Sequence, residues 1–210
     1  LKIGAIMVPV NTKLKAHELS YILIHSKPKA VIAETYLQET IEKIPSVDAS
    51  ASSHLQNVVY VDADAPKASL SSLLVPQGTY ISEDITEIDG AFLCYTSGTT
   101  GLPKGALISH INMIHTVMHY HYHLVSDESS RTLIAVPLFH ITGLAAQFLH
   151  MVYVGGSTVI LRQYQNEEYI HHIVKHEVNF VANVPTIFIM MGTSPLLKEQ
   201  NLDFVKIVGY

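Results

Sequence analysis

Short runs of β-branched residues alternate along this chain with longer stretches in which apolar residues recur at helical spacing. Leu19, Ile22 and Leu23 share one helical face, and Pro28 predicts the end of that helix. The apolar runs predict strands over residues 30–33, 58–61, 91–95, 132–136, 157–161, 179–182 and 204–210. Helical spacing predicts helices over residues 35–45, 111–118, 142–152, 166–176 and 185–191. Strands that alternate with helices predict an α/β fold, with layered sheets of mostly parallel strands flanked by helices.

Polar segments between these elements indicate how the chain is organised. Residues 46–56 and 62–80 are rich in Ser, Asp, Ala and Pro, which predicts surface loops. Residues 126–130, Ser-Asp-Glu-Ser-Ser, carry no apolar anchor and are the best candidate for a boundary between subdomains. We therefore expect a first α/β subdomain over residues 1–125 and part of a second over residues 126–210.

Composition narrows the class of protein. The 210 residues hold 13 Lys and Arg against 18 Asp and Glu, a formal net charge of -5, which argues against a nucleic-acid-binding protein. A hydrophobic share of 48% allows a real core and excludes intrinsic disorder. The single cysteine allows no internal disulfide and no secretory leader opens the chain, so we expect a cytoplasmic protein.

Two stretches lack Lys, Arg, Asp and Glu altogether, residues 132–161 and 178–197. Both are long enough to raise the question of a membrane span. Gly, Pro, His or Asn interrupts each of them every few residues, which favours buried strand–turn–helix units. We expect no transmembrane segment.

Residues 95–105, Tyr-Thr-Ser-Gly-Thr-Thr-Gly-Leu-Pro-Lys-Gly, stand apart from the rest of the chain. Glycines let the backbone curl so that successive N–H groups point inward, hydroxyls add donors, and Lys104 supplies a charge for phosphate oxygens. Pro103 stands where the Walker motif requires glycine, and residues 105–108 read as a strand. The segment is therefore interpreted as a phosphate-binding loop between two strands, and the alternative is a hairpin loop without function.

The complete eleven-residue string resembles the nucleotide loop of the adenylate-forming superfamily, which includes acyl-CoA synthetases, coumarate-CoA ligases, luciferases and peptide-synthetase adenylation domains. Four further segments are similar to blocks of these enzymes and follow in the family's order: residues 4–11, 136–144, 155–159 and 184–186. The resemblance spans essentially the whole chain.

The resemblance implies an acid-CoA ligase for a fatty or aryl acid, which uses ATP, Mg²⁺ and coenzyme A. A carboxylate is converted to an acyl-adenylate, and coenzyme A then displaces AMP. It implies catalytic roles for Lys104 and His140, a magnesium contact for Thr96, and acid-binding roles for Phe139 and His140 in the acyl-pocket motif over residues 136–144. The nucleotide-binding residues that it implies are Thr96, Ser97, Gly98, Thr99, Thr100, Gly101 and Lys104.

His140 is informative because relatives that activate amino acids typically carry Asp after this aromatic residue, where it pairs with the substrate ammonium group. The pair Phe139-His140 offers no such counter-charge, which favours a plain carboxylic acid. Without the motif, a buried structural histidine would be the simpler reading. Five further histidines, at 119, 121, 123, 172 and 176, are interpreted as helix-surface residues, and Cys94 as a buried small hydrophobe.

Several family features are missing: the acidic residue that completes the magnesium site, the aspartate that binds the ribose hydroxyls, the hinge and the C-terminal lysine. Because the chain also starts at Leu1 and ends at Tyr210 directly after a strand, we interpret it as a fragment of the large N-terminal domain. We expect this fragment alone to be inactive in carboxylate-dependent pyrophosphate–ATP exchange. The alternatives are a luciferase-like or peptide-synthetase enzyme and a non-catalytic nucleotide- or acyl-adenylate-binding relative; a homodimer is compatible with all of them.

Overall fold

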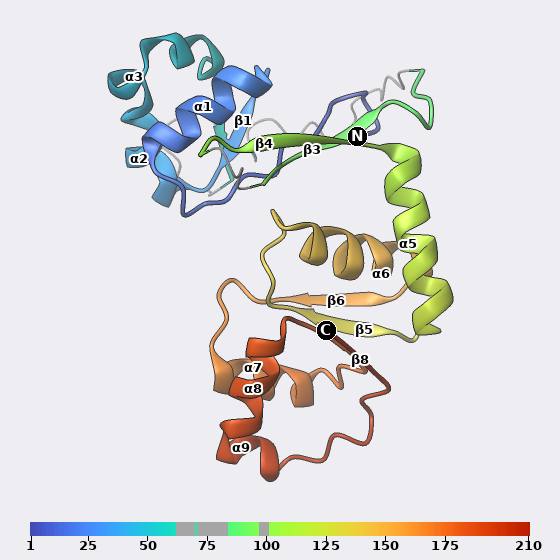
Figure 1. Ribbon diagram of the computed structural model, residues 1–210. Coiled ribbons are helices and arrows are strands. Elements are labelled where there is room, and N and C mark those ends of the chain that lie inside the picture. Colours follow the sequence, from blue (N-terminus) through green and yellow to red (C-terminus); the bar gives the residue numbers. More distant parts are fainter. Residues whose placement is uncertain (62–69, 71–83, 97–100) are drawn as a thin grey trace. The chain divides into compact units, whose positions relative to one another are not determined.

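The computed structural model describes residues 1–61, 70, 84–96 and 101–210 (Figure 1). These residues form two compact units, Leu1–Ile85 with Tyr95–Ala106 and Thr86–Cys94 with Leu107–Tyr210. The division differs from the one expected at residues 126–130. That segment is an ordered turn of the second unit, in which Ser126 and Ser130 are buried and the Asp127 backbone N–H donates to Ser130 Oγ at 3.0 Å.

The first unit is built from short elements around a two-stranded parallel sheet. Its helices and strands are α1 (Ala16–Ser26), β1 (Val31–Ala33), the 3-10 helix η1 (Thr35–Leu37), α2 (Gln38–Glu42), α3 (Ile44–Val47), the 3-10 helix η2 (Ala49–His54) and β2 (Val58–Tyr60). Helix α1 ends as expected, because Lys27 adopts a left-handed conformation just before Pro28. Strands β1 and β2 pair in parallel, with Val31 opposite Val58.

Two details of the first unit correct the sequence predictions. The helix expected over residues 35–45 is divided into η1, α2 and α3. The break between α2 and α3 lies next to Pro45, which lacks the backbone N–H that a continuous helix needs. The loop expected over residues 46–56 is largely helical. The Asp48 carboxylate caps η2 by accepting from the Ser50 N–H at 2.9 Å, and Ala51 is fully buried in the core. The expected loop at residues 62–80 lies, except for Leu70, outside the described residues.

The ribbon of β3 (Gly90–Thr96) and β4 (Lys104–Ser109) passes through both units. The two strands pair with each other, and the seven residues that join them are too few for a parallel crossover. The predicted strand on each side of the predicted phosphate loop is therefore confirmed. Within the second unit, Ala91, Phe92 and Cys94 of β3 pack with Met113 of α5 (His110–Leu124).

The second unit is centred on a four-stranded parallel sheet in the order β6-β5-β7-β8. Its elements after α5 are β5 (Arg131–Ile134), the π-helix η3 (Thr142–Leu149), α6 (His150–Val154), β6 (Ser157–Ile160), α7 (Asn166–Lys175), β7 (Phe180–Ala182), α8 (Pro185–Thr193), α9 (Pro195–Lys198) and β8 (Ile207–Gly209). The expected α/β fold with parallel strands is confirmed. The helix expected over residues 142–152 is π-helical in its first eight residues, which correspond to η3.

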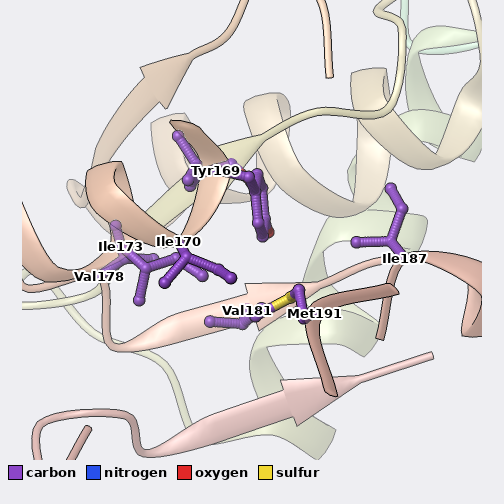
Figure 2. Close-up of a cluster of buried hydrophobic side chains, with 8 residues drawn as sticks. Tyr169, Ile170, Ile173, Val178, Val181, Ile187 and Met191 are labelled. Atoms are coloured by element: carbon purple, nitrogen blue, oxygen red, sulfur yellow. The ribbon is translucent and has the colours of Figure 1, made fainter. Parts of the chain in front are cut away.

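Helices cover both faces of this sheet. Figure 1 shows α6 on one side of β5 and β6, and α7 and α8 on the other. On the second side, Tyr169, Ile170 and Ile173 of α7 are fully buried against Val181 of β7 and Met191 of α8 (Figure 2). Each such aliphatic side chain contributes about 1.5–3 kcal/mol through burial. The chain order turns from β6 back across β5 to β7, so the direction of winding changes between β5 and β7.

Candidate functional site

The end of the β3–β4 ribbon at which the two strands are connected carries the described part of the predicted phosphate loop. Thr96 is the last residue of β3 and Lys104 the first of β4, and both side chains are exposed. Gly101 has a backbone φ of +93°, which residues other than glycine rarely adopt. Among the described residues, no atom lies within 4 Å of the position that a Cβ would take there. Glycine is therefore required here by the backbone and not by space. The predicted residues Ser97, Gly98, Thr99 and Thr100 lie outside the described residues.

A tyrosine–histidine contact anchors this end of β3 within the first unit. Tyr95 Oη lies 2.6 Å from His25 Nδ1, and the two rings meet edge to face with centroids 5.7 Å apart. Burial and the nearby Tyr21 raise the pKa of Tyr95, so its hydroxyl stays protonated and donates to the imidazole. Sequence reasoning missed His25, because nothing in the pattern of α1 connects it to a residue seventy positions later.

The second candidate segment, residues 136–144, lies in the second unit directly after β5. Val136 is buried, and the backbone then turns so that the His140 N–H donates to the Pro137 carbonyl at 2.9 Å. The Leu144 N–H donates to the His140 carbonyl at 3.0 Å, which joins this turn to η3. Phe139 is half-buried, while the side chain of His140 is exposed.

The ring of His140 is oriented by the backbone. Its Nδ1 accepts from the Thr142 N–H at 3.2 Å, so the proton of the neutral ring is on Nε2. None of the described residues bonds that Nε2. The exposed N–H can therefore donate to a carboxylate or phosphate oxygen.

Gly143 holds the turn close to η3. A Cβ at this position would stand 2.6 Å from the Val136 carbonyl oxygen and 2.8 Å from the Pro137 carbonyl oxygen, distances that no side chain tolerates without a backbone shift. Glycine here serves close packing, in contrast to Gly101. The π-helix that contains Gly143 is a rare geometry that often occurs at functional sites.

The five helix histidines and the cysteine discussed in the sequence analysis have surroundings typical of residues with a structural role. The side chains of His119, His121 and His123 are exposed along α5, and the rings of His172 and His176 stack with centroids 5.4 Å apart. Within the described ranges, no group of three or more His, Cys, Asp or Glu residues could hold a metal ion. Cys94 is buried, and burial raises the pKa of its thiol, which suits a packing role.

The predicted residues thus fall in two places. Thr96, Gly101 and Lys104 belong to the first unit, and Phe139 and His140 to the second. The structure brings Thr96 and Lys104 to one end of the ribbon, and it fixes Phe139 and His140 in one turn.

Comparison with known proteins defines the class to which this fold and these segments belong. Residues 1–209 match the AMP-binding enzyme family, and the chain is a member of that family. Among the described residues, no helix is both long and apolar enough to cross a bilayer.

Individual relatives are carboxylic acid–CoA ligases. The chain is 32% identical over 186 residues to 2-succinylbenzoate–CoA ligase of Bacillus licheniformis, which covers 88% of this chain and 35% of that protein. It is 29% identical over 205 residues to feruloyl-CoA synthase of Amycolatopsis sp, which covers 97% of the chain and 38% of the relative. The structure of an anthranilate CoA ligase in complex with anthranoyl-AMP superposes with a TM-score of 0.87 at 25% identity, over 99% of this chain and 40% of that one. The chain thus spans little more than a third of the length of these curated relatives.

Proposed function

We propose that this chain is part of an AMP-forming acid–CoA ligase. The oxygen of a carboxylate attacks the α-phosphorus of ATP and pyrophosphate leaves. The sulfur of coenzyme A then attacks the acyl carbon of the adenylate, so that the thioester forms and AMP leaves. The family match over residues 1–209 supports this proposal, as do the relatives that activate succinylbenzoate, ferulate and anthranilate.

The observation that carries the proposal is the position of Lys104. Its ammonium group is exposed at the start of β4, next to a glycine- and hydroxyl-rich segment. No ion pair involving Lys104 forms within the described part of the chain. An ammonium group placed in this way can bind phosphate oxygens and stabilise the charge that develops on the leaving pyrophosphate.

The chain fits a magnesium ion only in part. Mg²⁺ prefers oxygen ligands and is usually bound by one or two carboxylates together with substrate phosphates. The Thr96 hydroxyl is exposed beside the loop and is a suitable oxygen donor. It would serve as one ligand, and the carboxylate ligand would come from outside this chain.

We assign the recognition of the acid to residues 136–144. The Nε2–H of His140 is oriented by the Thr142 backbone and can donate to an oxygen of the acid or of its adenylate. No carboxylate occupies the position after Phe139, so a substrate ammonium group would lack its counter-ion there. We therefore propose a fatty or aryl acid without an α-amino group as the substrate, in a cytoplasmic enzyme.

The test is an acid-panel assay of the full-length protein, in which hydroxylamine traps the activated acyl group. The proposal predicts ATP-dependent hydroxamate with fatty or aryl acids, and little with α-amino acids. Hydroxamate formed chiefly from amino acids would contradict the assignment of His140. If no acid yielded hydroxamate while nucleotide still bound, the protein would be a non-catalytic nucleotide-binding relative.

A further inference from the structure

The two central strands of the sheet in the second unit, β5 and β7, pair with each other over a shorter stretch than β5 and β6 do. β5 and β6 pair over four positions, from Arg131 opposite Ser157 to Ile134 opposite Ile160. The register between β5 and β7 consists of Thr132 opposite Phe180. Beyond that position, side chains take the place of backbone partners.

A fully buried amide bridges the two strands where their ladder ends. Gln147 of η3 donates through Nε2 to the Ala182 carbonyl of β7 at 3.0 Å. The same nitrogen lies 3.4 Å from the Leu133 carbonyl of β5 and 3.4 Å from Thr132 Oγ1. One side chain therefore links both strands from the η3 side of the sheet.

A buried side chain on the opposite side of the sheet, that of Tyr169, also lies near the Leu133 carbonyl. The hydroxyl of Tyr169, on α7, lies 3.5 Å from the Leu133 carbonyl oxygen. The Asn183 side-chain amide, directly after β7, donates to the Tyr169 hydroxyl. Both side chains are buried, so solvent does not replace these bonds.

The side chain of Gln147 bonds its described neighbours through the amide nitrogen Nε2 and not through the oxygen Oε1. Two of the three groups around Nε2 are carbonyl oxygens, which only accept, so the amide nitrogen must face them. Its Oε1 is buried, and none of the described residues donates to it. A buried acceptor without a partner lowers stability. The arrangement therefore provides a defined distance between two strand ends more than it provides stability.

These strand ends lead into candidate binding segments. β5 continues into residues 136–141, and β7 continues through Asn183 into Pro185 at the start of α8. The winding of the sheet reverses between β5 and β7, and ligands of open α/β sheets bind at the carboxyl ends of the strands at such a point. Gly143, on the same helix as Gln147, packs on the Val136 carbonyl.

We propose that Gln147 is a positioning residue for the acid substrate: it sets the distance between the ends of β5 and β7, and so the direction in which residues 136–141 present His140. This inference rests on the proposed function for its kinetic consequence. Its structural consequence does not depend on activity and can be measured on the full-length protein without substrate.

The structural test is amide hydrogen exchange of three variants. Gln147→Met removes the donor at similar size, and Gln147→Glu turns an oxygen toward the carbonyls. Asn179→Leu is the matched control at the amino edge of the same sheet, where Asn179 accepts from the Arg131 N–H at 2.8 Å and donates to the Ser129 carbonyl at 3.0 Å. We expect both Gln147 variants to speed exchange at residues 135–141 and 183–186 about tenfold, the effect of losing a hydrogen bond of about 1.4 kcal/mol. The control should speed exchange only near residues 128–131.

Unchanged exchange at residues 135–141 in Gln147→Met would overturn the proposal, and so would an equal effect of Asn179→Leu there. If the Gln147 variants do not fold, Tyr169→Phe decides. That change removes one hydroxyl from the same junction, and it should speed exchange in the same two segments by a smaller factor. An unaltered pattern in a folded Tyr169→Phe would then refute the proposal.

The kinetic test uses the full-length protein. Gln147→Met should raise the KM for the acid about tenfold and leave the KM for ATP within about twofold, whereas Asn179→Leu should change neither. Equal rises in both KM values would show a merely structural role. A wild-type protein without acid-dependent turnover would instead refute the proposed function, and the exchange data would still decide the role of Gln147.

Discussion

The two segments that carry the predicted site residues differ in how their side chains are held. At the end of the β3–β4 ribbon, the side chains of Thr96 and Lys104 are exposed, and Tyr95 contacts α1 through His25. In residues 136–144 the backbone holds His140 through hydrogen bonds to Pro137, Thr142 and Leu144, and Gly143 packs closely on the carbonyls of Val136 and Pro137.

This difference fits the ligands that we propose for each segment. A polyphosphate is flexible and highly charged, and a long ammonium side chain can follow it at little cost. A carboxylate that must attack phosphorus in line needs a fixed orientation. The comparison predicts that changes at the ribbon affect chemistry more than folding, and that changes in residues 136–144 affect both.

The largest effect is expected from Lys104→Ala in the full-length protein. Loss of the ammonium group that stabilises the charge on the leaving pyrophosphate should lower kcat for hydroxamate formation about 10²–10³-fold. The free energy of unfolding should change by less than about 0.5 kcal/mol, because the side chain is exposed. Lys29→Ala, an exposed lysine of the same unit, is the control. Undiminished turnover in Lys104→Ala would remove Lys104 from the mechanism.

Gly143→Ala should destabilise the second unit. The added methyl group meets two backbone carbonyl oxygens, and overpacking of this kind costs about 1–3 kcal/mol. Urea unfolding followed by circular dichroism measures the loss. Gly192→Ala is the control, because Gly192 lies in α8 with nothing within 4 Å, and alanine there should stabilise the helix by about 0.5–1 kcal/mol. Equal effects at the two glycines would disprove the close packing at Gly143.

Tyr95→Phe tests the anchor of the ribbon. The change removes the hydroxyl that donates to His25 and should cost about 0.5–1.5 kcal/mol in the unfolding of the first unit. Tyr36→Phe, at an exposed tyrosine of the same unit, should cost nothing measurable. Hydrogen exchange of the amides of β3 reports the difference. Unchanged hydrogen exchange of the β3 amides in Tyr95→Phe would show that the contact with His25 does not stabilise the ribbon.

The smallest effect concerns acid stability and a histidine outside the candidate site. His150 is fully buried; its Nε2 lies 2.7 Å from Ser126 Oγ, and it packs against the rings of Tyr120 and Phe180. Burial lowers its pKa below the ordinary 6.5, partly offset by the bond to the Ala146 carbonyl, and the nearby His121 lowers it further.

The sign of the pH effect follows from that shift. Below pH 6.5, His150 binds a proton in the unfolded chain but stays neutral in the folded chain. Its contribution to the free energy of unfolding is therefore fully present above pH 6.5 and decreases as the pH drops toward the lowered pKa. Unfolding of His150→Asn should depend less on pH between 7 and 5 than that of the wild type. His123→Asn, at an exposed position of α5, should keep the wild-type slope. Parallel slopes for wild type and His150→Asn would contradict this assignment.

Local patterns in the sequence were enough for most strands and helices and for the segment 95–105. Leu19, Ile22 and Leu23 reveal a helical face without any other part of the chain. The loop is conspicuous because a run of Gly, Ser and Thr ending in Lys is rare within a hydrophobic chain. Its residues 97–100 lie outside the described part, so their role in binding nucleotide stays a prediction.

What the sequence could not indicate depends on contacts between distant residues. Gln147 bonds carbonyls that lie 14 and 35 positions away, and a glutamine in a helix normally suggests a surface residue. Ser126 looked like part of a linker until its bond to His150, 24 positions later, placed it in the core. The need for glycine at 143 likewise depends on where the preceding strand ends.

The measurement that tests the central claim most directly is isotopic exchange between pyrophosphate and ATP, catalysed by the full-length protein with and without a carboxylic acid. Reversal of adenylation is the only step that this assay detects. We predict exchange that requires the acid, and none from the 210-residue chain by itself. Exchange that is independent of acid, or complete absence of exchange with every acid that the full-length protein binds together with ATP, would contradict the account.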